Sequence, residues 1–216
     1  MKKFAVVLSG CGVLDGAEIH EATLSLLAIA LAGAEYEIFA PDIAQYHVIN
    51  HITGKEMVEK RNVLIESARI ARGKISPLSM FKAASFDALL FPGGFGAAKN
   101  LSSFAFDGPA CKVNGEVESA IKAMLSAKKP IGALCIAPAI LARIIESAKV
   151  TIGQDKGTAD AILAMGGKHV STSHGEVVED TINRVFTTPC YMLDASIIDI
   201  YAGANNVVKA MMKSMK

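Results

Sequence analysis

Short apolar blocks alternate with longer segments of helical spacing along the whole chain. Compact aliphatic runs closed by a nearby Gly, Pro or Cys predict buried strands over residues 4–8, 36–39, 88–91 and 131–134, with two more strands near Val177 and Val185. The longer segments predict helices over residues 18–31, 117–127, 136–147, 159–165 and 194–212. Strands that alternate with helices favour right-handed βαβ crossovers, so we expect an α/β fold with a mostly parallel sheet and helices on both faces.

The chain length of 216 residues suits one large domain, and we expect residues 1–216 to form it. The irregular stretch at about 42–82 predicts an insertion near a strand's carboxyl end, a position from which such segments commonly cover active sites. Within it, the charges of Arg61, Glu66 and Arg69 favour a solvated helix face over a substrate clamp.

Charge and hydropathy indicate small molecules as ligands. The net charge is +1 and both signs are scattered, which gives no footprint for nucleic acid or anionic lipid. No apolar run approaches the roughly 18 residues that a membrane helix needs. The apolar run at 4–8 is also shorter than the about 7–15 residues of a secretory signal, so it is better interpreted as a strand.

The cysteines and histidines suggest reduced thiols and no bound metal. Cys11, Cys111, Cys135 and Cys190 lie far apart in a chain large enough to fold without disulfides, which favours a cytosolic location. No CxxC pair and no HExxH spacing occur, so we expect neither a metal nor a cofactor.

The stretch Ala133-Leu134-Cys135-Ile136-Ala137 carries a candidate nucleophile at the end of a predicted strand. A nucleophile elbow is a strained strand-to-helix turn, and it requires small residues two positions on either side because larger side chains would collide there. Ala133 and Ala137 meet that requirement. We expect the helix N-terminus after Cys135 to favour its thiolate, although a buried core cysteine is the competing interpretation.

Two further elements bear on the same chemistry. The glycines of Phe91-Pro92-Gly93-Gly94-Phe95-Gly96 let backbone N–H groups approach a ligand, so the amides of Gly94 and Ile136 are a candidate oxyanion hole. Glu21 lies on the buried face of the helix predicted over 18–31, where apolar neighbours raise the pKa of a carboxyl. If Glu21 faces Cys135, it can act as general acid and base.

These motifs resemble the ThiJ/PfpI superfamily, and within it the enhancing-lycopene-biosynthesis (ElbB, isoprenoid biosynthesis) branch. The resemblance spans nearly the whole chain and rests on the segments 8–13, 15–22, 48–51, 61–66, 92–101, 135–138 and 187–189. It implies a flavodoxin-like three-layer sandwich that forms a homodimer, with Cys135 as elbow nucleophile and Glu21 as the carboxyl beside it.

The resemblance also implies a reaction. Hydrolases and amidotransferases of the superfamily place a histidine downstream of the cysteine, whereas residues 151–155 contain none, and His174 is a distant candidate. The family instead suggests a glutathione-independent glyoxalase, in which Cys135 adds to a small aldehyde such as methylglyoxal or glyoxal and Glu21 shuttles the proton to give a hydroxy acid.

Other interpretations stay open on the sequence. Cys135 is alternatively the oxidisable thiol of a redox sensor or stress-response binding protein. A dinucleotide site at Gly10-Cys11-Gly12 and Gly16 is disfavoured because Asp15, Glu18 and Glu21 would repel a pyrophosphate. Cys11 is interpreted as a small hydrophobic filler rather than as part of the active site.

Overall fold

The computed structural model describes residues 1–215, in which seven strands form one sheet in the order β3-β2-β1-β4-β5-β9-β8. Neighbouring strands are parallel except β8, which pairs antiparallel with β9. A separate parallel pair is formed by β6 and β7. The strands are β1 (Lys3–Val7), β2 (Glu35–Ala40), β3 (Ser76–Pro77), β4 (Ala88–Phe91), β5 (Ile131–Leu134), β6 (Lys149–Val150), β7 (Lys168–His169), β8 (Val178–Asp180) and β9 (Val185–Thr188).

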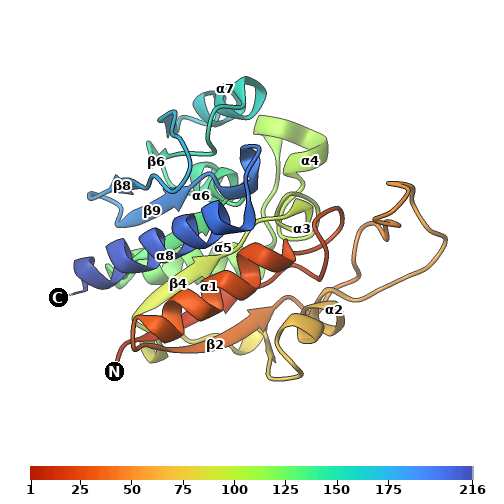
Figure 1. The fold of residues 1–216 in the computed structure, drawn as a ribbon, viewed down its shortest axis with the longest axis horizontal. Helices are drawn as coiled ribbons and strands as arrows, with labels where there is room; N and C mark the ends of the chain where they lie inside the picture. The colour runs from red at the N-terminus through yellow and green to blue at the C-terminus, as the bar shows by residue number, and fades with distance from the viewer. Residues whose placement is uncertain (216) are drawn as a thin grey trace.

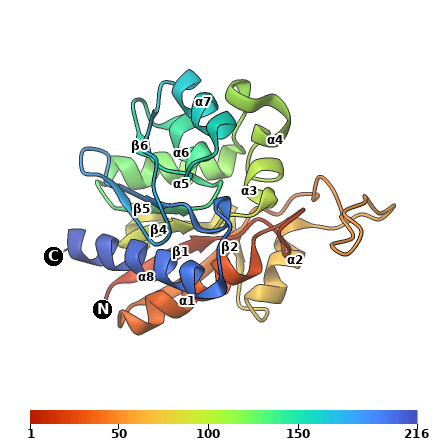
Figure 2. The ribbon, with the colours of Figure 1, turned by 45° about the horizontal axis from the view of Figure 1, so that its top comes forward.

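Helices cover both faces of the sheet. Figure 1 shows α1 and α8 side by side on one face, and Figure 2 shows α5 and α6 on the other. The α-helices are α1 (Ile19–Leu31), α2 (Val63–Ile70), α3 (Phe95–Lys99), α4 (Phe104–Asp107), α5 (Gly115–Ser126), α6 (Pro138–Ile144), α7 (Lys156–Ala164) and α8 (Ile197–Ser214). Short 3-10 helices are η1 (Leu78–Met80), η2 (Ala83–Ser85), η3 (Gly108–Ala110) and η4 (Cys190–Met192).

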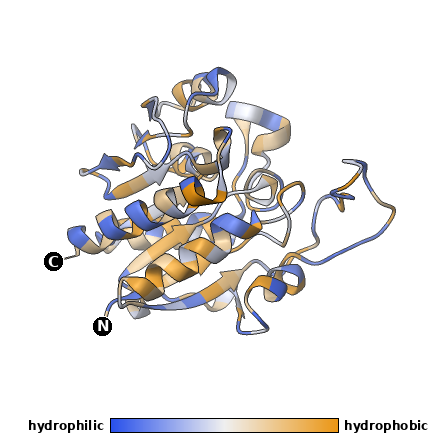
Figure 3. Ribbon diagram, in the orientation of Figure 1, coloured by the Kyte–Doolittle hydropathy of each residue, from blue (hydrophilic) through white to orange (hydrophobic). Residues whose placement is uncertain are grey.

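The core has two halves because the side chains of each strand alternate between the faces. In β1, Ala5 and Val7 join the cluster under α5 and α6, whereas Phe4 and Val6 join the cluster under α1 and α8. Both sets are fully buried, which is why β1, β4 and β5 are apolar at almost every position (Figure 3). The order β2-β1-β4-β5-β9 is that of a flavodoxin-like sheet, which confirms the predicted fold class.

Element boundaries differ from the prediction where caps decide them. The helix predicted from residue 136 begins at Pro138, because residues 135–137 form the turn that leaves β5. The last helix begins at Ile197 rather than 194, because Ser196 and Asp199 form a capping box in front of it. Within residues 1–215 no helix is long and apolar enough to cross a membrane.

The irregular stretch after β2 projects from the body as an extended excursion before α2 (Figure 1). Antiparallel bridges at Ala44–Asn62 and Ile49–Glu56 hold its two arms together. The expectation of a solvated charged face at its end is wrong for Glu66, which is buried and paired with both Arg61 and Arg69, at 3.4 and 3.0 Å. The arginines therefore neutralise a buried carboxylate at the base of the excursion.

Leu90→Ala is expected to lower the free energy of unfolding by about 2–5 kcal/mol, because the side chain is fully buried between β4 and the α1/α8 layer. Urea unfolding measures the change. Leu163→Ala on the exposed face of α7 is the matched control, with an expected change below about 0.5 kcal/mol. Equal losses in the two variants would contradict this assignment of the core.

Candidate active site

Cys135 occupies a tight turn between β5 and α6. Its φ is +60°, a left-handed conformation that costs energy for a residue with a side chain, so the predicted strained turn is present. The Cys135 amide donates to the carbonyl of Thr188 at 3.0 Å, which ties the turn to the end of β9. Ala133 and Ala137 are fully enclosed on either side, where larger side chains would have no room.

Glu21 lies in the first turn of α1 and is completely buried. Its carboxyl accepts the Gly93 amide at 2.9 Å and the Tyr191 amide at 3.2 Å, and it shares a hydrogen bond with the Cys135 thiol. Burial, followed by the negative charge of Glu18, raises the pKa of Glu21 to about 8. The sequence-based expectation of a raised pKa at Glu21 is confirmed.

Glycines at the end of β4 allow the thiol and the carboxyl to meet. A methyl group at Gly93 would collide with Cβ of Cys135 and Oε2 of Glu21. Gly94 has a φ of +94°, and a side chain there would collide with the backbone at Gly16 and Glu18. Bare backbone therefore lies directly against the side chains of Cys135 and Glu21.

The predicted oxyanion amides also converge on this point, because the N–H groups of Gly94 and Ile136 donate to the Cys135 sulfur and lower its pKa. Burial and the neighbouring Glu21 outweigh them and hold the pKa of Cys135 well above its usual range. The expectation that the helix N-terminus favours the thiolate is therefore wrong. The short helix α6 starts only after the turn, so its dipole does not offset desolvation beside a carboxyl.

Cys135 lies at one wall of a cavity of about 720 Å³. Its other walls come mainly from α3, the α4–η3 segment, α7 and η4, which contribute Phe95, Phe104, Ala161 and Met192. Val13 from the loop after β1 and Ile136 from the turn before α6 complete them. Sequence reasoning missed Tyr191, whose backbone holds Glu21 and which also lines this cavity. Tyr191 follows β9, the strand that pairs with β5, and β5 leads into Cys135. This position was the sequence signal that could have identified Tyr191.

The structure does not bring the remaining candidates to the cavity. His174 is exposed on the loop before β8 and lies near Asp199 of α8, outside the described residues that line the cavity. Cys11 is half-buried near Glu66 and Arg69, where burial is the main cause that raises its pKa. Among residues 1–215, no group of three or more His, Cys, Asp and Glu side chains could hold a metal ion.

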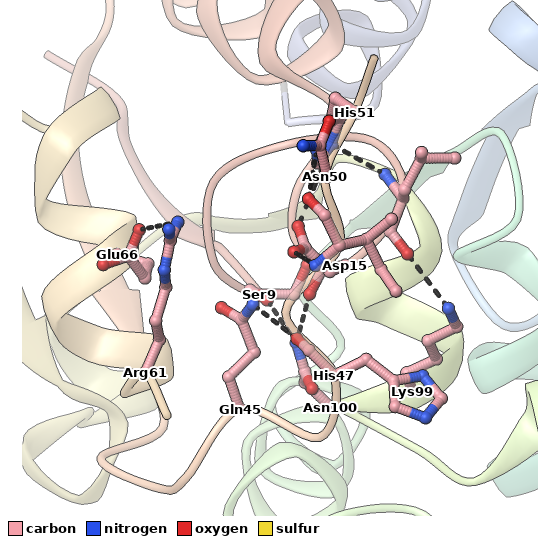
Figure 4. Close-up of polar contacts among 12 residues, drawn as sticks. Ser9, Asp15, Gln45, His47, Asn50, His51, Arg61, Glu66, Lys99 and Asn100 are labelled. Carbon is pink, nitrogen blue, oxygen red and sulfur yellow. Dashed lines mark hydrogen bonds and ion pairs between the residues drawn. The ribbon is translucent and has the colours of Figure 1, made fainter. Parts of the chain in front are cut away.

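The loop after β1 is tied by hydrogen bonds to Asn100, at the end of α3, and to the excursion. Asn100 donates to the carbonyls of Ser9 and Asp15 at 2.8 and 2.9 Å, and Asp15 accepts the amide of Ile49 from the excursion (Figure 4). The side chain of Glu18 caps α1 by accepting the Glu21 amide. This network fixes the start of α1 and thereby the place of Glu21.

The buried carboxyl predicts a pH-dependent stability. The folded state raises the pKa of Glu21 from 4.5 to about 8. The contribution of this shift to folding stability is therefore full below pH 4.5 and is lost as the pH rises through 8. Glu21→Gln removes this effect, so wild-type stability relative to the variant is expected to fall by up to about 1.4 kcal/mol per pH unit within that window.

Urea unfolding of both proteins at several pH values between 5 and 9 measures this difference. Glu118→Gln on the solvent face of α5 makes the same chemical change at an exposed position, and it is expected to follow the wild-type pH dependence. A constant difference between wild type and Glu21→Gln across the window would contradict the assignment.

Curated proteins similar to this chain match almost all of it. The ES1 protein homolog, mitochondrial, of Rattus norvegicus is 49% identical over 98% of this chain and 83% of its own length. The glutamine amidotransferase-like class 1 domain-containing protein 3, mitochondrial, of Homo sapiens is 48% identical over 98% of this chain and 82% of its own length. A search of protein-family models found no match.

These relatives correct the expectation of a cytosolic location, because the rat and human proteins and a Danio rerio ES1 protein are all named mitochondrial. The expectation rested on the unpaired, widely spaced cysteines. Reduced thiols are compatible with more than one compartment, so they did not discriminate between them.

Solved structures agree with the relatives. An isoprenoid biosynthesis protein with amidotransferase-like domain from Ehrlichia chaffeensis has a TM-score of 0.94 and 38% identity, with 100% of both chains covered. Drosophila melanogaster DJ-1beta shares the fold alone, with a TM-score of 0.57 at 16% identity over 99% of this chain and 95% of its own. The chain shares the fold of DJ-1 and ThiJ/PfpI proteins, and it belongs to the ES1 and glutamine amidotransferase-like class 1 family.

Proposed function

We propose that the chain is a glyoxalase-type enzyme that converts small 2-oxoaldehydes into 2-hydroxy acids without glutathione. The observation that carries the proposal is the contact between the Cys135 thiol and the buried Glu21 carboxyl, beside the amides of Gly94 and Ile136. This set supplies a nucleophile, a general base and two donors for a developing negative charge within one site.

In the first step, the Glu21 carboxylate accepts the thiol proton while the Cys135 sulfur attacks the aldehyde carbon. The carbonyl oxygen takes up negative charge, which the amides of Gly94 and Ile136 are placed to stabilise. Glu21 then returns the proton to that oxygen and gives a hemithioacetal. A base with a pKa of about 8 suits this exchange because it both accepts and releases a proton near neutral pH.

In the second step, Glu21 removes the proton from the former aldehyde carbon, which the adjacent ketone makes acidic, and an enediol forms. The proton returns to the former ketone carbon and leaves a thioester of the hydroxy acid on Cys135. Water hydrolyses the thioester and frees the thiol. The aldehyde carbon is oxidised and the ketone carbon reduced within the same molecule, so methylglyoxal yields lactate with no external oxidant.

The family contains enzymes, which supports a catalytic role, but glutamine hydrolysis fits this site less well. That reaction uses a histidine to activate the cysteine and to protonate the leaving ammonia. The described lining of the cavity contains no histidine, and Glu21 takes the position of proton carrier beside Cys135.

The redox-sensor hypothesis is less favoured by the geometry. A sensor thiol is accessible and has a low pKa, because the thiolate is the species that reacts with peroxide. Cys135 is 7% exposed and its pKa is raised, so its resting thiol is protonated and shielded.

Aldehyde turnover by purified variants tests the proposal. Cys135→Ala is expected to abolish lactate formation from methylglyoxal, because it removes the atom that forms the covalent intermediate. Glu21→Gln is expected to lower kcat by about 10²–10⁴-fold through the loss of general acid and base catalysis. Coupled lactate assays report the rates.

Cys111→Ala is the control for these variants, since Cys111 is a buried thiol that does not line the cavity. It is expected to keep wild-type turnover. Full methylglyoxal turnover by Cys135→Ala would overturn the proposal.

The pH profile gives a second test. The reactive form needs Glu21 as a carboxylate and Cys135 as a thiol, so kcat/KM is expected to rise as the pH increases through about 8 and to fall at higher pH, where the thiol ionises. A value of kcat/KM that stays constant from pH 6 to 9 would contradict the requirement for a Glu21 carboxylate and a Cys135 thiol.

A further inference from the structure

The cavity beside Cys135 is far larger than a three-carbon aldehyde. Its volume of about 720 Å³ falls in the range of about 300–1,000 Å³ that proteins use for drug-sized ligands. Methylglyoxal would contact Cys135 and leave most of the walls without a partner. The walls come from four separate elements, so the space is a built feature of the fold.

The side chains that line this space are mainly apolar. They include Val13, Phe95, Phe104, Ile136, Ala161 and Met192. Val13 and Phe95 are also 38% and 46% exposed, so they present apolar surface at the cavity that the protein itself does not cover.

Positive charge is missing from the described lining, which contains no lysine, arginine or histidine. Asp155 is its one charged residue, and its carboxylate accepts the Thr158 amide at 2.7 Å as the cap of α7. Lys99 lies over the Phe95 ring, 5.0 Å from its centroid, but its amine donates to the carbonyl of Leu14. A carboxylate or phosphate on the substrate would therefore find no counter-charge.

We propose that the preferred substrates are uncharged aldehydes whose carbonyl carries a medium-length aliphatic or aromatic group, with that group bound between α4, α7 and η4. This inference rests on the proposed function for the reaction and extends it to the substrate class. The apolar group replaces water along Phe104, Ala161 and Met192 while the aldehyde carbon reaches Cys135.

A series of 2-oxoaldehydes that differ only in the alkyl group tests the substrate class. From methyl- through ethyl- and propyl- to butylglyoxal, kcat/KM is expected to rise about fourfold for each methylene that becomes buried. Phenylglyoxal is expected to exceed methylglyoxal as well. A flat or falling series would overturn the inference.

Ala161→Phe tests where the group binds, because the added ring fills the cavity from α7. The ratio of kcat/KM for butylglyoxal to that for methylglyoxal is expected to fall at least about tenfold, the loss of roughly two buried methylenes. Ala164→Phe places the same ring on the exposed end of α7 and is expected to keep the wild-type ratio. Equal ratios in both variants would place the group elsewhere and overturn the inference.

Alkylation of Cys135 separates this inference from the reaction itself. N-methyl- and N-butylchloroacetamide and the anion chloroacetate are compared by mass spectrometry, with Cys135→Ala as the background for the other thiols. The N-butyl reagent is expected to react at least about tenfold faster than the N-methyl reagent, and chloroacetate slowest. If that order holds while no oxoaldehyde is turned over, the proposed reaction fails and the apolar cavity stands; similar rates for all three reagents overturn the cavity inference.

Discussion

A carboxyl group without access to water is the constraint on which the site depends. Glu21 is tolerated in the core because it receives two backbone amides and the Cys135 thiol as partners, and because it binds a proton at neutral pH. Those partners come from the ends of β4, β5 and β9, three adjacent strands of the sheet. The position of Glu21 is therefore set by the sheet topology, and any shift in that order would leave a buried carboxyl unsatisfied.

The sequence was sufficient for the architecture because each main strand is apolar on both faces and each main helix carries a recognisable end. The turn at Cys135 was equally visible, since Ala133 and Ala137 are the small residues that such a turn requires. Single-domain organisation and homodimerisation stay predictions.

The sequence could not predict the protonation state of Cys135 and Glu21. The pKa of Cys135 depends on how deeply the thiol is buried and on its distance from Glu21. Glu21 lies 114 positions earlier in the sequence. The helix-dipole argument considered only the local turn, whereas desolvation and the neighbouring carboxyl are tertiary effects. The cavity walls on α4, α7 and η4 were missed for the same reason, because no local pattern marks residues that meet only after folding.

A protonated thiol beside a protonated carboxyl is a weak nucleophile at rest, and for the proposed reaction this suits a thiol that acts only on a bound carbonyl. Loss of one proton leaves the pair with a single proton to share, and the sulfur gains full nucleophilic character only as Glu21 takes that proton. A soluble peroxide or thiol reagent meets a protonated, largely buried sulfur at one wall of an apolar cavity. In the proposed reaction, burial would thus link selectivity to reactivity, because the same desolvation that raises both pKa values also disfavours the entry of ions relative to uncharged molecules.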